Sequence, residues 1–288
     1  MEQPTYKDLF QNINSQLSQR AGLLAKRVLL VGWPALIFIV LDSIFKFNNQ
    51  TSFSILFFIL IYAVILGHIF STEKIIWIDS YFDGKNLQPK ESFLIAKKLF
   101  WPTTSLRFLL FFRYFLFPFI LYVSLWPIFL LNQDITFCGM MVYFWPLLGL
   151  GILALYWLYI DIKLRYIWFI FLDNYGKSDF SYKNLFKQMN ELNQVNKLDS
   201  FKKSLAVNLG ADFVENLIQF PLFKRISSIF RKSEGGTNNV VSTYSSGFIG
   251  EMSRLAKIVA NYVLYRYSRE QLYKEPQIIN ENIYSLLK

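Results

Sequence analysis

The sequence predicts an all-α fold: a polytopic helical membrane protein with four transmembrane helices, further cytoplasmic or interfacial amphipathic helices and an internal repeat of span pairs. Three observations support this prediction. The 288-residue chain is 53% hydrophobic and 19% aromatic. Its first half holds four long apolar runs separated by polar breaks, and segments 75–93 and 166–186 share a pattern. Because lipid offers the backbone no hydrogen bonds, apolar runs of this kind fold as helices.

The four spans follow from length. A helix needs roughly 20 apolar residues, at about 1.5 Å per residue, to cross a hydrocarbon core of about 30 Å. The runs that approach or exceed this length are 28–45, 52–70, 108–131 and 138–160. Their prolines are expected to bend the helices rather than end them, since neighbouring helices can satisfy the freed carbonyls.

The spans divide the chain into three regions. Residues 1–27 form a predicted cytoplasmic amphipathic helix, which Thr5 and Asp8 begin as a capping pair. Residues 28–160 form the four-helix membrane region with a cytoplasmic loop at 71–107. Residues 161–288 form a basic helical region in the cytoplasm or on the membrane surface, with eighteen Lys or Arg against twelve Asp or Glu.

The basic residues predict the orientation. Those before position 28 and within 71–107 include Arg20, Lys26, Arg27, Lys74, Lys85, Lys90, Lys97, Lys98 and Arg107. The connections at 46–51 and 132–137 hold only Lys46. By the positive-inside rule both termini are therefore cytoplasmic, and a bacterial inner membrane is the expected location.

Segments 75–93 and 166–186 indicate a duplicated unit. Trp77 matches Trp168, and each copy continues into a Gly-Lys pair, at Gly84 and Gly176. In both copies an aromatic helix is expected to break at Asp or Asn plus Gly and to restart as an amphipathic helix at position 89 or 181.

Residues 205–230 and 248–267 continue the repeat as a third helix pair. This pair carries Asp212, Glu215, Glu251, Arg254 and Lys257. A charged side chain costs about 2.5 to 3.5 kcal/mol near mid-bilayer on insertion scales, so the pair is expected to be cytoplasmic or interfacial. The alternative is a membrane pair covered by partners. Residues 233–247 are expected to be a flexible polar loop.

The connection after the second span resembles a known group of proteins. It carries the stretch S-F-x-x-A-K-K, formed by Ser92, Phe93, Ala96, Lys97 and Lys98. With the repeated span pairs, this resembles bacterial integral membrane proteins such as the membrane domain found beside glycerophosphodiester phosphodiesterases. The resemblance covers the layout of residues 58–267; it departs in the polar third pair and in having no phosphodiesterase domain attached. It implies an accessory membrane role without catalytic residues.

Ionisable residues within the spans are the usual marks of transport. His68, Arg113 and Asp161 all fall near the inner ends of predicted spans. One interpretation is structural: Arg113 reaches lipid phosphates, Asp161 caps its helix and His68 is a polar interface residue. The other is an inward-facing site for an anion or a phospholipid headgroup, since a guanidinium matches phosphate geometry.

A second lipid contact is predicted in segment 222–232, where cations stand beside aliphatic and aromatic residues. The cations are Lys224, Arg225, Arg231 and Lys232. A helix of this composition lies on a membrane surface or packs on protein. The net charge of +10 is expected to favour contact with anionic phospholipid, because the sequence has no motif for binding nucleic acid.

The sequence offers no visible machinery for catalysis. It has one histidine and one cysteine, Cys138, and no metalloprotease or nucleophile motif, so neither an enzyme nor a cofactor or metal site is predicted. The acid pair Asp79 and Asp83 is expected to be solvated surface. We therefore predict a non-catalytic membrane scaffold or accessory subunit with a protein partner or as a homo-oligomer. The alternative is a transporter, channel or lipid-handling protein.

Overall fold

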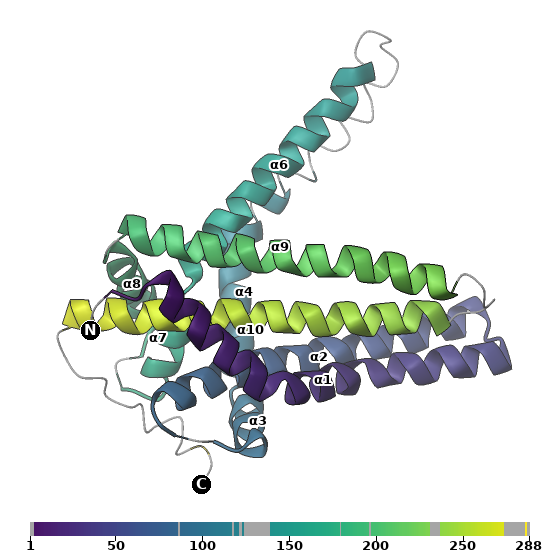
Figure 1. Ribbon diagram of the computed structural model, residues 1–288, viewed down its shortest axis with the longest axis horizontal. Coiled ribbons are helices and arrows are strands. Elements are labelled where there is room, and N and C mark those ends of the chain that lie inside the picture. Colours follow the sequence, from purple (N-terminus) through teal and green to yellow (C-terminus); the bar gives the residue numbers. More distant parts are fainter. Residues whose placement is uncertain are drawn as a thin grey trace. The chain divides into compact units, whose positions relative to one another are not determined.

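The computed structural model is helical throughout the part of the chain that it describes, which confirms the predicted all-α class (Figure 1). It describes residues 3–85, 87–116, 118–120, 123, 139–178, 180–195, 197–230, 237–273 and 286. The chain forms two compact units. The first is Met1–Lys98 with Tyr166–Lys288, and the second is Leu99–Arg165.

Helix α1 (Tyr6–Phe45) begins at the predicted capping pair. Thr5 Oγ1 accepts a hydrogen bond from the Asp8 backbone N–H at 3.3 Å, and the Thr5 backbone N–H donates to Asp8 Oδ2 at 2.8 Å. The helix runs without a break from the predicted amphipathic segment through Pro34. It ends at Lys46, whose left-handed backbone (φ 46°) brings its N–H to the Asp42 carbonyl.

Helix α2 (Asn49–Phe82) returns antiparallel to α1 after this short connection, with Asn48 as its N-cap. By length and composition, two of the described helices could cross a membrane: Tyr6–Asp42 within α1 and Gln50–Phe82 within α2. The predicted spans at 108–131 and 138–160 lie partly outside the described residues. The four-span topology therefore stays a prediction.

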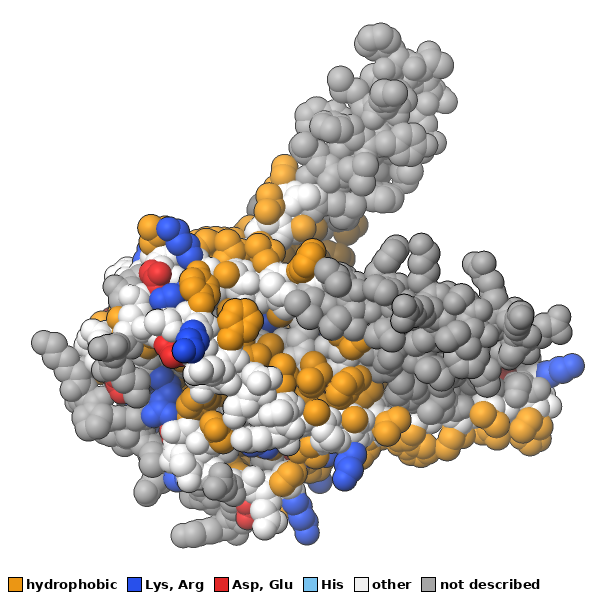
Figure 2. Space-filling model, viewed as in Figure 1, with side chains coloured by type: hydrophobic (Ala, Val, Ile, Leu, Met, Phe, Trp, Pro, Cys, Tyr) orange, Lys and Arg blue, Asp and Glu red, His pale blue; other side chains and the backbone are white. Residues whose placement is uncertain are grey.

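Large apolar side chains are exposed along one part of this hairpin, which we call the apolar belt. The belt comprises Leu29, Leu30, Trp33, Ile37, Val40, Leu41, Ile44 and Phe45 on α1 and Phe53, Leu56, Phe57, Phe58, Leu60, Ile61, Val64 and Ile65 on α2. Figure 2 shows orange side chains gathered along this part of the hairpin. Beyond the belt, α2 is buried from His68 to Ser80 except for the half-buried Ser71.

The two segments of the predicted repeat have the same local course. Helices α2 and α7 (Ile167–Asn174) both end just before a glycine with left-handed backbone, Gly84 at φ 71° and Gly176 at φ 82°. The chain then restarts as α3 (Pro89–Lys98) and α8 (Tyr182–Gln194), with Ser181 capping α8. The copies differ in one respect, because α7 is separate from the helix before it, which ends at Leu164.

Helices α9 (Lys197–Phe230) and α10 (Thr237–Tyr273) form the third pair. Helix α10 packs against α9 and α1 and also contacts α2 and α8 (Figure 1). The expectation of a flexible loop at 233–247 is wrong from Thr237 onward, where the chain is helical. Its Ser, Asn and Gly residues are weak helix formers, but intrinsic propensity is a weak guide to where a helix begins. A Cβ added to Gly247 would lie 3.3 Å from Val28 Cγ1, so the helices meet closely there.

The second unit contains α4 (Phe100–Leu110), a π-helical turn η1 (Phe111–Phe115) and α6 (Gly139–Leu164). Tyr156 of α6 donates a hydrogen bond to the Tyr114 carbonyl at 2.9 Å. The rings of Phe115 and Trp157 meet edge to face with centroids 6.2 Å apart. These contacts hold α6 against the π-helical turn within this unit.

Candidate functional site

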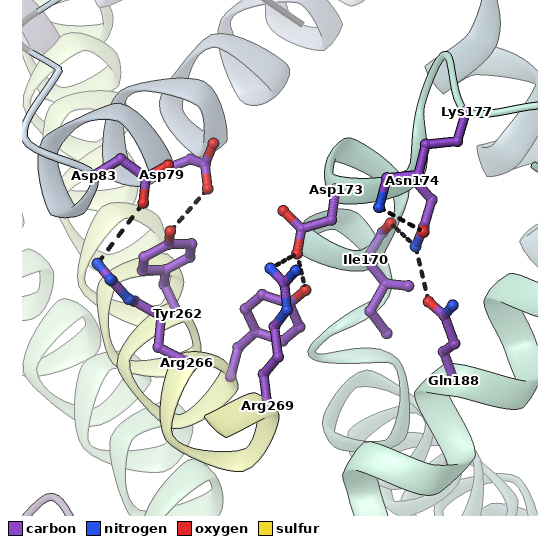
Figure 3. A network of polar contacts seen from close by, with 11 residues as sticks. Asp79, Asp83, Ile170, Asp173, Asn174, Lys177, Gln188, Tyr262, Arg266 and Arg269 are labelled. Atoms are coloured by element: carbon purple, nitrogen blue, oxygen red, sulfur yellow. Dashed lines mark hydrogen bonds and ion pairs between the residues drawn. The ribbon is translucent and has the colours of Figure 1, made fainter. Parts of the chain in front are cut away.

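A group of polar side chains in the first unit connects α10 to the end of the first helix in each predicted repeat copy (Figure 3). We call it the base network. It consists of Asp79 and Asp83 at the end of α2, Asp173 at the end of α7, and Tyr262, Tyr265, Arg266 and Arg269 on α10.

The first half of the base network holds the end of α2. Tyr262 donates its phenolic hydrogen to Asp79 Oδ1 at 2.8 Å. Arg266 donates to the Phe82 carbonyl at 2.6 Å, and its Nη1 lies 3.9 Å from Asp83 Oδ1. A tyrosine and an arginine one turn apart on α10 therefore bind the two acids and the last carbonyl of α2.

The second half uses the same pair of residue types. Asp173 Oδ2 accepts hydrogen bonds from the Tyr265 hydroxyl and from the Arg269 guanidinium. Tyr265 and Arg269 have the same four-residue spacing as Tyr262 and Arg266, displaced by three residues. Since residues three and four apart share a helix face, one face of α10 binds both copies.

Aromatic rings surround these polar groups. The Phe169 ring centroid lies 5.0 Å from that of Tyr262 and 5.4 Å from that of Tyr265. Burial raises the pKa of Asp173 above its usual range, and it raises the pKa of Tyr262 and Tyr265 well above 10. Both tyrosines therefore remain neutral hydrogen-bond donors at physiological pH. The pKa of Asp83 is also raised by burial, with Arg266 acting in the opposite direction.

A second buried ion pair fixes α1 to α2. Arg27 lies 2.5 Å from Glu73 Oε1, and Ser92 donates to the same oxygen at 3.3 Å. Trp77 donates its indole N–H to Ser92 Oγ. The Arg27 guanidinium lies over the Phe93 ring, 5.4 Å from its centroid. Ser92 and Phe93 of the S-F-x-x-A-K-K stretch therefore help to hold this buried pair.

Lys74 is also buried, and it pairs with Glu251 of α10. Glu251 also accepts from the exposed Arg254 at 2.9 Å. Lys74 and Arg27 were among the cations from which the orientation was predicted. Because each of these two has a carboxylate partner, the predicted orientation depends more on the exposed Lys90, Lys97 and Lys98.

The expectation that Asp79 and Asp83 are solvated surface is wrong. Asp79 is 7% exposed and the Asp83 side chain 4%. Their partners on α10 lie more than 180 residues away in the sequence, so no local pattern shows the pairing. One signal was available: the twice-repeated Tyr-x-x-x-Arg spacing on α10 places two phenols and two guanidiniums on one helix face.

The predicted anion cluster draws its residues from both units. His68 is buried on α2 in the first unit. Arg113 is exposed on the π-helical turn of the second unit, with its guanidinium 5.5 Å from the Tyr114 ring centroid. Asp161 is exposed near the end of α6 in the same unit. The cluster itself stays a prediction.

The predicted membrane-surface cations lie at the end of α9. Lys224 and Arg225 are on the helix, although only its backbone is described there. Arg231 and Lys232 lie outside the described residues. Their contact with lipid also stays a prediction.

The base network suits a structural role because its tyrosines and arginines bind the buried acids Asp79, Asp83 and Asp173, although Asp83 Oδ1 has only the ion pair with Arg266 and no hydrogen bond. Within the described ranges, no group of three or more His, Cys, Asp or Glu side chains could hold a metal ion. Comparison with known proteins finds no matching family model, curated protein or solved structure. The layout resemblance to membrane domains found beside glycerophosphodiester phosphodiesterases remains a prediction.

Proposed function

We propose that this chain is a non-catalytic integral membrane scaffold or accessory subunit that organises partners at the cytoplasmic face of the membrane. One observation supports this most strongly. The buried acids of both repeat copies are bonded to Tyr and Arg side chains of a single helix, α10. Such a buried polar network rigidifies the part of the chain where α2, α7 and α10 meet.

The proposed placement has the apolar belt of α1 and α2 in lipid and the base network on the cytoplasmic side. In this arrangement all four predicted spans cross a bacterial inner membrane and both termini are cytoplasmic. Sixteen large apolar side chains exposed to solvent would be a liability in water, which supports lipid as their environment.

The proposed partner surface is the outer face of α8. Leu185, Phe186, Met189 and Leu192 are buried on its inner face. Its outer face exposes Lys183, Asn184, Lys187, Asn190 and Gln194. A helix that is firmly docked on one side and polar with two cations on the other suits a partner segment carrying acidic residues.

The test is photo-crosslinking in the native membrane. A photoreactive amino acid at Lys187 should cross-link to one protein of constant mass in near-stoichiometric amount. The matched control replaces Phe58, which is 69% exposed in the apolar belt, and should cross-link to lipid. Charge reversal of Lys183 and Lys187 to Glu should then release the partner from the gently extracted protein.

Two results would count against the proposal. One is the combination of two observations: the photoreactive residue at position 187 cross-links to no protein, and the purified chain transports a solute across vesicle membranes. The other is protein cross-linking at Phe58 as strong as at Lys187, because the partner would then bind the belt and not the cytoplasmic face.

The alternative is a transporter, channel or lipid-handling protein with an inward-facing anion or phospholipid-headgroup site to which Arg113 of the second unit contributes. The position of Arg113 on a π-helical turn favours it, since such turns are frequent at functional sites. Under this alternative Arg113→Ala abolishes phospholipid or anion transport in vesicles and Arg113→Lys retains part of it. Under the scaffold proposal both variants retain the Lys187 cross-link.

A further inference from the structure

One end of the apolar belt, which we call the inner end, is formed by Leu29 on α1 and Ile65 on α2 and lies close to an aromatic pair. Trp33 of α1 donates its indole N–H to the Tyr62 hydroxyl of α2 at 3.3 Å, and Tyr62 donates to the Leu30 carbonyl at 3.1 Å. Trp33 is exposed, so its ring lies on the surface of the hairpin. Tryptophan and tyrosine are enriched where a bilayer meets water, because each has an apolar body and a polar tip. The pair is therefore suited to the boundary between acyl chains and headgroups.

A lysine lies beyond the inner end on the same face of α1. Lys26 is exposed, and it stands four residues before Leu30 and seven before Trp33, a spacing that places these side chains on one helix face. Along this face the belt ends at Leu30, and the next side chain is a cation. A bilayer leaflet has the same order, with acyl chains followed by phosphates.

Helix α3 brings two further lysines to this level. The chain reverses direction after α2, and the Phe93 ring of α3 meets the Phe70 ring of α2 with centroids 5.9 Å apart. Helix α3 therefore runs back along α2 toward the belt. Its last residues, the exposed Lys97 and Lys98, begin about 6 Å along α3 from Phe93, and the belt ends at Ile65, about 7 Å along α2 from Phe70.

We call Lys26, Lys97 and Lys98 the lysine collar. Within the part of the chain that the structure describes, no carboxylate forms an ion pair with any of the three. Lys98 donates to the Leu286 carbonyl, which is neutral and leaves the charge of Lys98 uncompensated. Glu215 lies on α9, which Figure 1 shows on the other side of α10 from α3. The collar therefore presents three positive charges to an anionic group.

We propose that the lysine collar binds the phosphates of anionic phospholipids in the cytoplasmic leaflet. The inference rests on the membrane placement proposed above and assigns the headgroups that the chain contacts at the inner end of the belt. The belt and the Trp33–Tyr62 pair favour lipid over an acidic protein segment, because a phospholipid supplies acyl chains for the belt and a phosphate for the adjoining collar. One lysine near an anionic bilayer surface strengthens the attraction about fivefold.

The test uses the purified full-length chain in phosphatidylcholine vesicles that contain a small fraction of spin-labelled phosphatidylglycerol or, in parallel, spin-labelled phosphatidylcholine. A fluorophore on Leu30→Cys, in a Cys138→Ser background, reports lipid contact at the inner end because the spin label quenches its emission. The quenching should give a relative affinity about fivefold in favour of phosphatidylglycerol. Lys26→Gln combined with Lys97→Gln should abolish this preference, whereas Lys26→Arg combined with Lys97→Arg should retain it. High salt should weaken it, because salt screens exposed charges.

Two controls separate the collar from the belt and from the net charge. The first places the fluorophore on Phe53→Cys at the other end of the belt, where quenching should show no preference because Lys46 there has Asp42 one turn away.

The second control is Lys7→Gln combined with Lys202→Gln, which removes the same charge from exposed lysines. Lys7 lies about 28 Å from Lys26 along α1, beyond the screening length of about 8 to 10 Å, so the preference at the inner end should persist. All of these lysines are exposed, so the thermal unfolding temperature of each variant should stay close to that of the wild type.

Each other result has a defined meaning. Equal quenching by the two lipids at Leu30→Cys overturns the collar proposal and leaves the membrane placement standing. A preference that survives neutralisation of Lys26 and Lys97, or that falls equally in the second control, has the same meaning. Absence of quenching at both reporters overturns the membrane placement as well. A photoreactive residue at Leu94, which is exposed one turn before the collar on α3, that cross-links to a protein in the native membrane would assign the collar to an acidic protein partner.

Discussion

At the scale of single residues, Arg269 is the partner on which the buried Asp173 depends most. Its guanidinium donates to the carboxylate, which is otherwise bonded to a neutral tyrosine. Arg269→Ala leaves a buried acid without its cation, and removal of one partner of a buried pair costs about 3 to 5 kcal/mol. We expect a large fall in the thermal unfolding temperature of the detergent-solubilised protein.

Arg254→Ala is the control for that experiment. Arg254 is on the same helix and pairs with Glu251, but its side chain is 72% exposed, and exposed pairs contribute about 0 to 1 kcal/mol. Equal effects of the two substitutions would show that Asp173 is not held in a dry environment.

Asp173 should also give the stability a pH dependence. Burial raises its pKa in the folded state above the ordinary Asp value, so between these two values the folded protein binds more protons than the unfolded chain. Stability therefore falls as pH rises through this window above about 4. Asp173→Asn should flatten the dependence of unfolding temperature on pH above about 4.

Replacement of the 46% exposed Asp199 by Asn serves as the comparison and should leave that slope close to wild type. A slope that is unchanged in Asp173→Asn would assign the pH dependence to another group, with Asp83 the next to test because burial raises its pKa as well.

At the scale of elements, the two glycine breaks are the most specific local features. Gly84 adopts φ 71° and Gly176 φ 82°, a region where a Cβ costs roughly 1 to 2 kcal/mol. Gly84→Ala meets no atom within 4 Å, so its effect should be this backbone cost alone. We expect Gly84→Ala and Gly176→Ala each to lower the free energy of unfolding by about 1 to 2 kcal/mol, measured in equilibrium or thermal unfolding.

Gly22→Ala should have the opposite effect and raise the free energy of unfolding. It lies inside α1 with no atom within 4 Å of an added Cβ, and alanine is favoured over glycine in a helix by up to about 1 kcal/mol. If Gly84→Ala proved as harmless as Gly22→Ala, the chain at position 84 would not require a left-handed backbone.

Local sequence signals predicted these elements well because the chemistry that sets them is local. Thr5 and Asp8 cap α1, and Gly84 and Gly176 end two helices where expected. The first ten residues of α10 are helical although their composition is typical of a loop, because local composition does not fix a helix boundary. Asp79 was misjudged because its partner Tyr262 is distant in sequence.

At the scale of the whole chain, the apolar belt and the basic loop together define the proposed orientation. Lys97 on α3 is exposed and belongs to the predicted cytoplasmic loop, whereas the exposed Gln50 is the second residue of α2, at the far end of the α1–α2 hairpin. If the belt of α1 and α2 spans the membrane, these two positions lie on opposite sides. The chain is suited to the measurement because Cys138 is its only cysteine.

Single cysteines at Gln50 and Lys97, each in a Cys138→Ser background, should react differently with a membrane-impermeant maleimide. We expect Gln50→Cys to react in intact cells and Lys97→Cys only after permeabilisation, because the exposed cations at 90, 97 and 98 remain on the cytoplasmic side. The reverse pattern would mean that the loop at 71–107 lies outside the cell. It would contradict the proposal that the chain binds partners at the cytoplasmic face. Reaction of both positions only after permeabilisation would mean that the hairpin does not cross, and the belt would then have to be covered by protein.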